Sequence, residues 1–253
     1  MMANQTAQAN HDQLFPNHVS TLKVTDPEFI NLFDNFTFDE VLQHSQLSDQ
    51  LRLKVTLASL IAVQSLNEYQ AMLGAALTIG VTPIEVKEIV YQAVPYAGLA
   101  KVFDFLNATN DVFKARHINV PVEPQGTTTP TDRYAKGLDT VRRIAGDAVD
   151  KMLSTAPENQ KHFATFLADN CFGDYYTRKG LDTATRELLT FAMLISMGGA
   201  DPQVKGHIAN NVRVGNDKQK LLDVITVLLP FIGYPRTLTA VSLLNQVIPE
   251  TEA

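Results

Sequence analysis

Four polar residues in the second half of the sequence have the types and spacing that acid–base chemistry needs. His207, Asn210 and Asn211 share one face of a predicted amphipathic helix, because residues three and four apart are neighbours on a helix surface. Glu187 lies on the apolar segment that precedes this helix. An imidazole titrates near neutral pH, and a neighbouring carboxylate fixes its tautomer and favours its charged form. The sequence therefore predicts that His207 transfers protons and that Glu187 orients it.

An internal repeat provides a control for this prediction. Six residues in the segment 47–61 recur 134 positions later, and after one inserted residue the glycine, proline and glycine at positions 80, 95 and 98 recur 135 positions later. In the first copy, Leu53 stands at the position of Glu187, Met72 at that of His207, and alanines at those of both asparagines. Polar groups at inward positions are costly unless they are paired or line a wet cavity. The second copy is therefore expected to contain a polar pocket that the first copy lacks.

Each member of the pair also has an ordinary structural interpretation. A lone buried histidine is more often simply hydrogen-bonded than catalytic, and a glutamate in the early turns of a helix can complement the helix dipole. The two residues occur together, and both positions are apolar in the first copy. This combination favours the functional interpretation of His207 and Glu187.

Other candidates lie just before the apolar segment of the second copy. Asp174, Tyr175 and Arg178 are expected to close the mouth of the pocket. Arginine binds carboxylates through two parallel hydrogen bonds, so Arg178 or Arg186 is a candidate for holding a substrate carboxylate. Arg186 has an equivalent arginine in the first copy, which favours a structural ion pair shared by both copies.

The remaining reactive residue types predict no metal and no cofactor. Cys171 is the only cysteine and aligns with a threonine of the first copy, so it is expected to be a small buried core residue. No metal-ligand spacing, glycine-rich phosphate loop or G-x-S-x-G motif occurs.

The composition excludes several classes of protein. The chain has 253 residues, with 21 basic and 27 acidic residues and a net charge of -6, which argues against nucleic acid as a partner. One cysteine cannot form an internal disulfide, so a reducing compartment fits best. The first twenty residues hold no lysine, arginine or apolar run, and no apolar run reaches about 18 residues. We therefore expect a cytoplasmic protein with no membrane span.

The hydrophobic pattern predicts an all-α fold built from two similar units. Residues 49–64 and 183–197 are apolar almost all round, which is typical of central buried helices. In each copy a shorter amphipathic helix follows, then a helix that Pro95 or Pro230 is expected to end, and a last helix. Period-two alternation typical of strands is hardly present.

These elements predict four regions. Residues 1–25 are expected to be a disordered tail, and residues 26–117 a first unit with a degenerate site. Residues 118–132 hold three prolines, a glycine and a threonine run, which is the composition of an irregular linker. Residues 133–253 form the second unit, which carries the candidate active site.

The motifs of the second copy resemble those of the carboxymuconolactone decarboxylase family. The segments that carry the resemblance are F-G-D-Y-Y-T-R-K-G-L from Phe172, R-E-L from Arg186, and His207 eight residues before Gly215. The first copy shows G-V-T-P from Gly80 and Y-Q-A-V-P-Y-A-G from Tyr91. The resemblance implies helical units that associate in pairs. Because single-unit members form trimers of dimers, it implies a homotrimer for this fused pair.

The sequence is also similar to a second branch of the superfamily, the alkyl hydroperoxide reductase D-type disulfide reductases. Their motif is C-x-x-C-x-x-x-H, and its histidine corresponds to His207. The two cysteine positions fall on Ala200 and Gln203. Thiol–disulfide exchange needs a thiolate and a resolving partner, so peroxiredoxin-like activity is disfavoured.

The decarboxylase resemblance implies a cofactor-independent reaction on a small carboxylated lactone or related organic acid. In this reading His207 is the general acid/base, Glu187 orients it and Arg178 binds a substrate carboxylate. A non-catalytic binding or scaffold member of the family is the alternative from another class. An enclosed pocket in which His207, Glu187 and an arginine converge favours an enzyme, whereas a filled, solvent-free site favours a scaffold.

Overall fold

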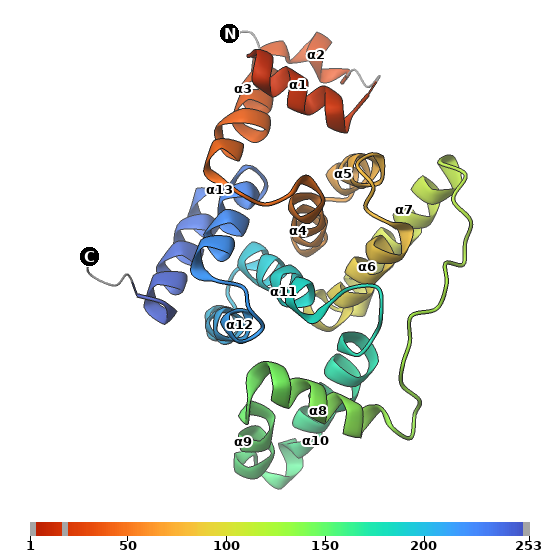
Figure 1. The fold of residues 1–253 in the computed structure, drawn as a ribbon, viewed down its shortest axis with the longest axis vertical. Coiled ribbons are helices and arrows are strands. Elements are labelled where there is room, and N and C mark those ends of the chain that lie inside the picture. The colour runs from red at the N-terminus through yellow and green to blue at the C-terminus, as the bar shows by residue number, and fades with distance from the viewer. Residues whose placement is uncertain (1–3, 17–19, 250–253) are drawn as a thin grey trace.

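The computed structural model describes residues 4–16 and 20–249. Within these residues the chain forms helices and irregular connections and contains no strand, which confirms the all-α prediction. Figure 1 shows two helical units that meet at the centre of the molecule, where α4 and α11 lie side by side.

The two units repeat the same order of elements, each with a π-helical segment and a long central helix. The elements of the first unit are α1 (Gln5–Leu14), α2 (Leu22–Thr25), α3 (Pro27–Asn35), the π-helix η1 (Phe36–Glu40), the 3-10 helix η2 (Leu42–His44), α4 (Asp49–Ala62), α5 (Leu66–Thr78), α6 (Pro83–Ala97) and α7 (Leu99–Ala115). Those of the second unit are α8 (Arg133–Ala145), α9 (Ala148–Thr155), the 3-10 helix η3 (Glu158–Gln160), α10 (Lys161–Phe166), the π-helix η4 (Leu167–Tyr176), α11 (Thr183–Met197), α12 (Asp201–Arg213) and α13 (Lys218–Val247).

The N-terminal region corrects one prediction, because residues 5–14 form helix α1 rather than a disordered tail. Asn4 caps this helix by accepting a hydrogen bond from the backbone of Ala7 at 2.7 Å. Ala7 and Leu14 are buried in the main core, which stabilises the helix. The buried positions 7, 11 and 14 of α1 correspond to the buried positions 137, 141 and 144 of α8, which lie 130 residues later. Helix α1 is therefore the first helix of the first unit. Parts of the predicted tail, residues 1–3 and 17–19, lie outside the described residues.

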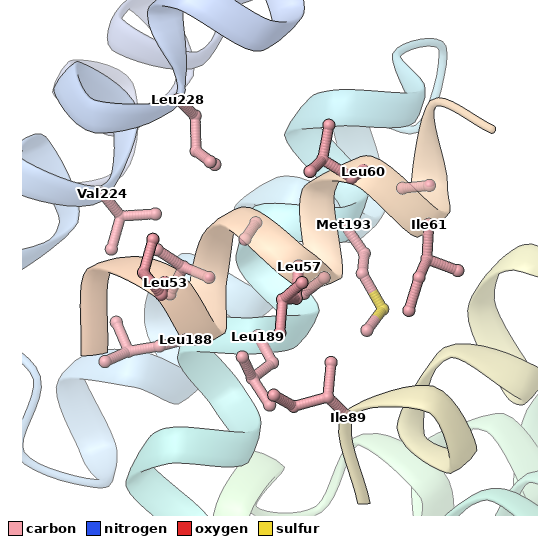
Figure 2. Packing of buried hydrophobic residues seen from close by; sticks show 14 of the residues in the cluster. Leu53, Leu57, Leu60, Ile61, Ile89, Leu188, Leu189, Met193, Val224 and Leu228 are labelled. Carbon is pink, nitrogen blue, oxygen red and sulfur yellow. The ribbon is translucent and has the colours of Figure 1, made fainter. Parts of the chain in front are cut away.

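The centre of the molecule is a hydrophobic core that both units share. Leu53 and Leu57 of α4 pack near Leu189 and Met193 of α11 (Figure 2). Burying one leucine of this kind contributes about 1.5–3 kcal/mol. A hydrogen bond of 2.7 Å between the hydroxyls of Ser59 and Ser196 links the same two helices inside this core.

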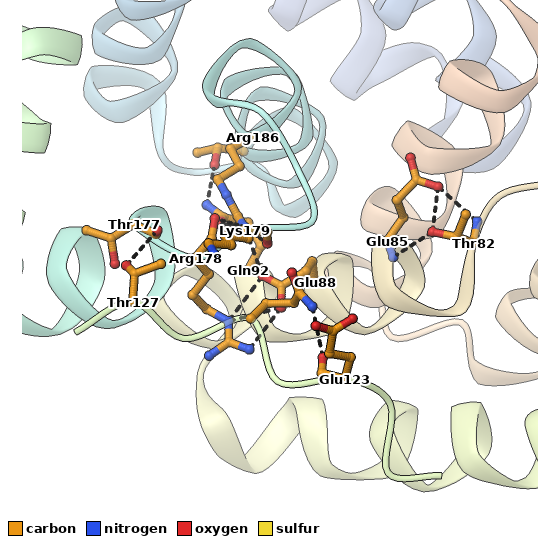
Figure 3. Close-up of polar contacts among 12 residues, drawn as sticks. Thr82, Glu85, Glu88, Gln92, Glu123, Thr127, Thr177, Arg178, Lys179 and Arg186 are labelled. Atoms are coloured by element: carbon orange, nitrogen blue, oxygen red, sulfur yellow. Dashed lines mark hydrogen bonds and ion pairs between the residues drawn. The ribbon is translucent and has the colours of Figure 1, made fainter. Parts of the chain in front are cut away.

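Polar side chains cap the starts of the long helices. Ser48 accepts a hydrogen bond from the backbone of Leu51, and Asp182 accepts one from Thr185 at 2.7 Å. Thr82 and Glu85 form a complete capping box, drawn in Figure 3. These caps fix where the long helices begin.

The helix ends differ from the prediction, because Pro95 and Pro230 do not terminate their helices. The helix α6 continues to Ala97, and the first part of α13 continues past Pro230. Both stop at equivalent glycines, Gly98 and Gly233, whose φ angles of 90° and 76° lie where other residues are strained. The proline only removes one hydrogen bond, whereas the positive φ angle reverses the chain.

Among the described residues, α13 alone is long and apolar enough to cross a membrane by length and composition. Gly233 interrupts this helix, and several of its leucines are buried in the shared core. Both features are those of a core helix of a folded domain.

Residues between α7 and α8 contain no helix and lead from the first unit to the second (Figure 1). Thr127 and Thr128 donate hydrogen bonds to the backbone oxygens of Thr177 and Gly173. Helix α8 packs so closely on η4 that a side chain at Gly137 would clash with the backbone oxygen of Ala168. This contact builds a second, smaller hydrophobic cluster, which includes Val141, Ile144, Val149, Cys171, Phe172 and Tyr176.

Candidate active site

The structure brings His207 and Glu187 into direct contact. The imidazole Nδ1 of His207 lies 2.7 Å from Oε2 of Glu187. The Glu187 carboxylate is fully buried, and the His207 side chain is 13% exposed. Because Nδ1 is occupied by the carboxylate, Nε2 is the nitrogen left for a ligand. The contact that the sequence predicts is confirmed, and its catalytic role remains a prediction.

Two buried tyrosines continue this contact into a hydrogen-bond network. The Tyr176 hydroxyl donates to Oε1 of Glu187 at 2.8 Å and lies 2.9 Å from the hydroxyl of Thr190. The Tyr96 hydroxyl lies 3.0 Å from that of Tyr176, and the Tyr96 ring meets the His207 ring edge-on at 5.7 Å. Burial, together with the nearby Glu187 carboxylate, raises the pKa of both phenols well above the usual value. Both phenols therefore stay protonated. Tyr176 is hydrogen-bonded to one carboxylate oxygen of Glu187, and His207 is hydrogen-bonded to the other.

The two asparagines of the predicted face have different roles. Asn211 is buried, and its amide donates to the backbone oxygens of Glu187 and His207 at 3.1 and 2.8 Å. Asn216 donates in turn to the side chain of Asn211 at 2.9 Å. Asn211 therefore fixes the distance between α11 and α12, whereas the half-buried Asn210 faces a cavity.

A cavity of about 650 Å³ opens beside the His207–Glu187 pair. It lies between the two hydrophobic clusters, with α8, α9 and η4 on one side and α11 and α12 on the other. Tyr96 and Pro95 of the first unit complete its wall, so both units of one chain build the pocket. The lining is mostly apolar rather than polar as predicted, and its polar members are Tyr96, Gln203, His207, Asn210 and Arg213.

Arg213 is a residue of the cavity lining that the sequence interpretation missed. It is exposed at the end of α12 and lines the same cavity as His207 and Asn210. The three residues follow one another at intervals of three, and the first copy has a threonine, Thr78, at the position of Arg213. This spacing could have identified Arg213 from the sequence, because it extends the polar face of α12 by one more turn.

Arg178, the predicted carboxylate-binding residue, does not line the cavity. Its guanidinium makes a bidentate ion pair with the buried Glu88 of α6, with a shortest distance of 2.9 Å (Figure 3). Arg186 donates to the same carboxylate at 2.8 Å and to Gln92 at 3.0 Å. The structural role favoured for Arg186 is confirmed, but its ion pair is not shared by both copies, because Arg52 pairs with Asp49 of its own helix. The placement of Arg178 at the mouth of the pocket is corrected. Glu88 belongs to the other unit, so the ion pair joins the two units.

The other predicted residues near Arg178 also lie outside the cavity lining. Asp174 pairs with Arg133 at 2.7 Å and accepts a hydrogen bond from Asn170 at 3.0 Å. Tyr175 is half-buried and is not part of the lining either. The expectation that Asp174 and Tyr175 close the pocket is therefore corrected, because Asp174 instead ties η4 to the start of α8.

Cys171 is buried at the back of the tyrosine network, as expected for a core residue. Its Sγ lies 3.8 Å from the Tyr96 hydroxyl. Burial raises the pKa of this thiol to about 12. Cys171 is therefore not a thiolate at neutral pH and does not suit thiol–disulfide exchange.

The described residues contain no group of three or more His, Cys, Asp or Glu side chains arranged for a metal ion. The first unit does contain a cavity, of about 140 Å³, at the place equivalent to the His207 cavity. The prediction that the first copy lacks such a pocket is therefore wrong. Met72 replaces His207 in its lining, as expected.

The chain belongs to the carboxymuconolactone decarboxylase family. The model of that family matches residues 27–111 and again residues 161–246, which cover α3–α7 of the first unit and α10–α13 of the second. The two matches agree with the repeat seen in the fold. His207 and Glu187 lie in the second match.

Two particular proteins are similar to this chain over shorter stretches. The 4-carboxymuconolactone decarboxylase of Acinetobacter baylyi is 25% identical over 119 residues, which is 47% of this chain and 88% of that protein. An uncharacterized 15.0 kDa protein in the nqo9-nqo10 intergenic region of Paracoccus denitrificans is 26% identical over 106 residues, 42% of this chain and 74% of that protein.

Proposed function

We propose that the chain is a cofactor-independent decarboxylase acting on a small carboxylated lactone or a related organic acid. The observation that carries the proposal is the imidazole of His207, held at 2.7 Å by a fully buried carboxylate at the wall of an open cavity. The similarity to a 4-carboxymuconolactone decarboxylase supports the same reaction class. The single cysteine suits a reducing compartment, so we place this activity in the cytoplasm.

In the proposed reaction the pocket must bind the substrate carboxylate, stabilise the developing enolate and supply a proton to carbon. The bond between the substrate carboxylate and its carbon breaks, carbon dioxide leaves, and the electron pair delocalises into the lactone carbonyl. Arg213 binds the carboxylate, and Asn210 donates a hydrogen bond to the developing enolate oxygen, a contribution of roughly 3 kcal/mol for a well-placed donor. Protonated His207 then gives its Nε2 proton to carbon. Glu187 stabilises the imidazolium, and Tyr176 keeps that carboxylate in position.

An enzyme fits the cavity better than the two alternatives. A scaffold protein has no reason to keep an open space of about 650 Å³ beside the hydrogen-bonded His207–Glu187 pair, since filling it with side chains would stabilise the fold. A peroxiredoxin-type reaction lacks its thiolate, because Ala200 and Gln203 occupy the cysteine positions and Cys171 is buried.

The direct test is to incubate the full chain with 4-carboxymuconolactone and with other carboxylated lactones and to measure release of carbon dioxide. Turnover of one or more of these compounds supports the proposal. If carboxylated lactones bind in the cavity without any release of carbon dioxide, the binding or scaffold alternative is correct.

Arg213→Met is expected to raise KM for a carboxylated substrate by roughly 10- to 100-fold, with a smaller effect on kcat. A hydrogen bond to a charged group contributes about 1.5–3 kcal/mol, and the substitution removes the cation while keeping an apolar stem. Lys205→Met is the matched control, because Lys205 is an exposed cation of the same helix that does not line the cavity. Equal KM values for the two variants would show that Arg213 does not hold the carboxylate.

We also propose that the chain assembles as a homotrimer of fused pairs, the arrangement that the family resemblance implies. Large apolar residues remain more than half exposed at four equivalent places in both units. These pairs are Phe29 and Phe163, Leu32 and Phe166, Leu99 and Tyr234, and Phe103 and Leu238. Single exposed apolar residues are ordinary, but the same four positions in both copies are typical of surfaces that bury each other.

Replacing Phe103 and Leu238 together with glutamate is expected to convert the trimer into single chains, because burying two carboxylates in an apolar contact is unfavourable. Light scattering coupled to size-exclusion chromatography measures the mass. Val24→Glu is the control, since Val24 is 83% exposed and has no exposed apolar equivalent in the second unit. A wild-type mass of one chain contradicts this proposal.

A further inference from the structure

The first unit contains a second cavity whose charged residues are not those of the His207 site. Its volume is about 140 Å³, and it lies between α1, α2, α3, η1 and α5. The equivalents of α1, η1 and α5 in the second unit, α8, η4 and α12, line the His207 cavity. The two cavities are therefore related by the internal repeat, but their polar groups stand at different positions.

The carboxyl group of Asp34 is the main polar feature of this cavity. Asp34 is 4% exposed and lines the cavity. Within the part of the chain that the structure describes, its side chain makes no hydrogen bond or ion pair, and its oxygens are not among the fully buried unpaired atoms, because they reach the cavity. Its equivalent in the second unit is Ala168, which is also buried, so the fold does not require a carboxyl group at this place. A buried carboxyl without a partner is costly, and a ligand that pairs with it removes that cost.

A second carboxyl group borders the same space. Glu68 of α5 lines the cavity at the position that Gln203 occupies in the second unit. Burial raises the pKa of both Asp34 and Glu68, while His11 and Lys23 partly oppose the effect at Asp34. The charged groups around the cavity are therefore two carboxylates, the Lys23 ammonium and the titratable His11. Nδ1 of His11 lies 3.1 Å from the carboxylate of Asp12, and the other three groups leave a balance of one negative charge.

The remaining wall is built from aromatic rings. His11 lies 5.1 Å from Phe15 and 5.5 Å from Phe38, and Phe33 lies 6.0 Å from Phe38, all measured between ring centroids. All four rings line the cavity. Aromatic faces attract organic cations, and a desolvated cation over such a ring gains about 2 kcal/mol. Carboxylates beside an aromatic wall are the combination that binds alkylammonium groups.

We propose that this cavity, which we call the Asp34 pocket, binds a small organic cation, an amine or methylated ammonium with a body no larger than a benzene ring. The size limit comes from the volume, because an engineered protein cavity of about 150 Å³ holds one benzene molecule. The cation pairs with Asp34 and Glu68, and its apolar part contacts the aromatic rings. The pocket is separate from the His207 cavity, so the chain has a second ligand site with the opposite charge preference.

The test compares three probes of the same size on the full chain by isothermal titration calorimetry at pH 7.5. Benzylamine is the cation, benzyl alcohol the neutral analogue and benzoate the anion. Benzylamine is expected to bind at least about tenfold more tightly than the other two, because only the cation pairs with the carboxylates. No binding of benzylamine at millimolar concentration, or equal binding of benzoate, overturns the proposal.

Substitutions then test whether benzylamine binds in the Asp34 pocket. Asp34→Asn and Glu68→Gln are each expected to weaken benzylamine binding about tenfold, and Lys23→Met to strengthen it, since the opposing ammonium is removed. His207→Ala is the control for the other cavity and is expected to bind benzylamine as the wild type does. Wild-type affinity in both carboxyl variants, or loss of binding in His207→Ala, overturns the assignment.

The Asp34→Asn variant also has a defined folding check. Because the pKa of Asp34 is raised in the folded state, the ionised carboxylate destabilises the fold as the pH rises above the unfolded-state value. The asparagine variant is therefore expected to have a Tm at pH 7.5 no lower than that of the wild type, with the difference shrinking at acid pH. Lost binding with an unchanged or higher Tm then reports on the pocket and not on unfolding.

Discussion

Replacing His207 with glutamine is expected to lower kcat by about 10²- to 10⁴-fold while the fold stays intact. General acid–base catalysis by one well-placed side chain contributes an effect of this size. Glutamine reaches a similar distance and its amide donates a hydrogen bond to Glu187, but it does not titrate near neutral pH. The buried carboxylate therefore keeps two donors, the new amide and the Tyr176 hydroxyl, while proton transfer to carbon is lost.

The measurement is the rate of carbon dioxide release from a carboxylated lactone, with circular dichroism to confirm the helical fold. His162→Gln is the matched control, because His162 is an exposed histidine on α10 outside the cavity lining. Turnover by His207→Gln at the rate of the control would remove His207 from the mechanism. A decrease in both variants would point to a general loss of folded protein.

The internal repeat explains why the central part of the fold was predictable. The segments around α4 and α11 keep identical residues at a constant spacing, and their starts carry polar caps such as Ser48 and Asp182. The first helix was missed because α1 and α8 share only their pattern of buried positions, at a spacing of 130 rather than 134. The change in spacing falls between α1 and α3, where the connection in the first unit is shorter.

The same logic separates the site residues that were predicted from those that were missed. Glu187 and His207 were identified because a polar residue replaces an apolar one at an inward position of a shared fold. Tyr96 was missed because it belongs to the first unit, and comparison of the two copies does not reveal contacts between them. Arg178 was misplaced for the same reason, since its partner Glu88 lies 90 positions earlier in the chain.

The prediction for the end of α6 was wrong because the rule that proline ends a helix was applied too strictly. A proline in the last turn loses only one backbone hydrogen bond, and a packed helix tolerates that loss. Helix α6 therefore passes Pro95 and ends at Gly98. The two residues beyond Pro95 matter for the site, because one of them is Tyr96, whose ring meets that of His207.

Glu88→Ala is expected to lower the free energy of unfolding by about 3–5 kcal/mol, a large part of the roughly 5–15 kcal/mol typical of a folded domain. The Arg186 side chain is 1% exposed, and Glu88 is its counter-ion at 2.8 Å. Burial lowers the pKa of the Arg186 guanidinium, and the Glu88 carboxylate opposes that shift. Without Glu88, a guanidinium charge remains in the interior with only neutral acceptors, which is the costly outcome for a buried ion pair.

Urea unfolding followed by circular dichroism measures the loss. Asp150→Ala is the matched control, because it breaks the exposed ion pair with Arg142 and is expected to cost less than about 1 kcal/mol. A Glu88→Leu, Arg186→Met double variant should recover much of the stability, since it removes the two fully buried charges and leaves only the partly exposed Arg178 without its counter-ion. Equal losses in Glu88→Ala and Asp150→Ala would mean that water reaches Arg186 and that the ion pair adds little.

Glu88→Ala is expected to affect activity as well as stability, because hydrogen bonds connect Glu88 to the candidate site. Arg186 donates to Gln92, Gln92 donates to Thr190, and Thr190 contacts the Tyr176 hydroxyl that holds Glu187. This chain of hydrogen bonds runs from α6 of the first unit to the candidate site of the second. Glu88→Ala is therefore expected to lower kcat as well as stability. The Glu88→Leu, Arg186→Met double variant restores packing but not the hydrogen bond to Gln92. It should therefore regain stability more fully than kcat.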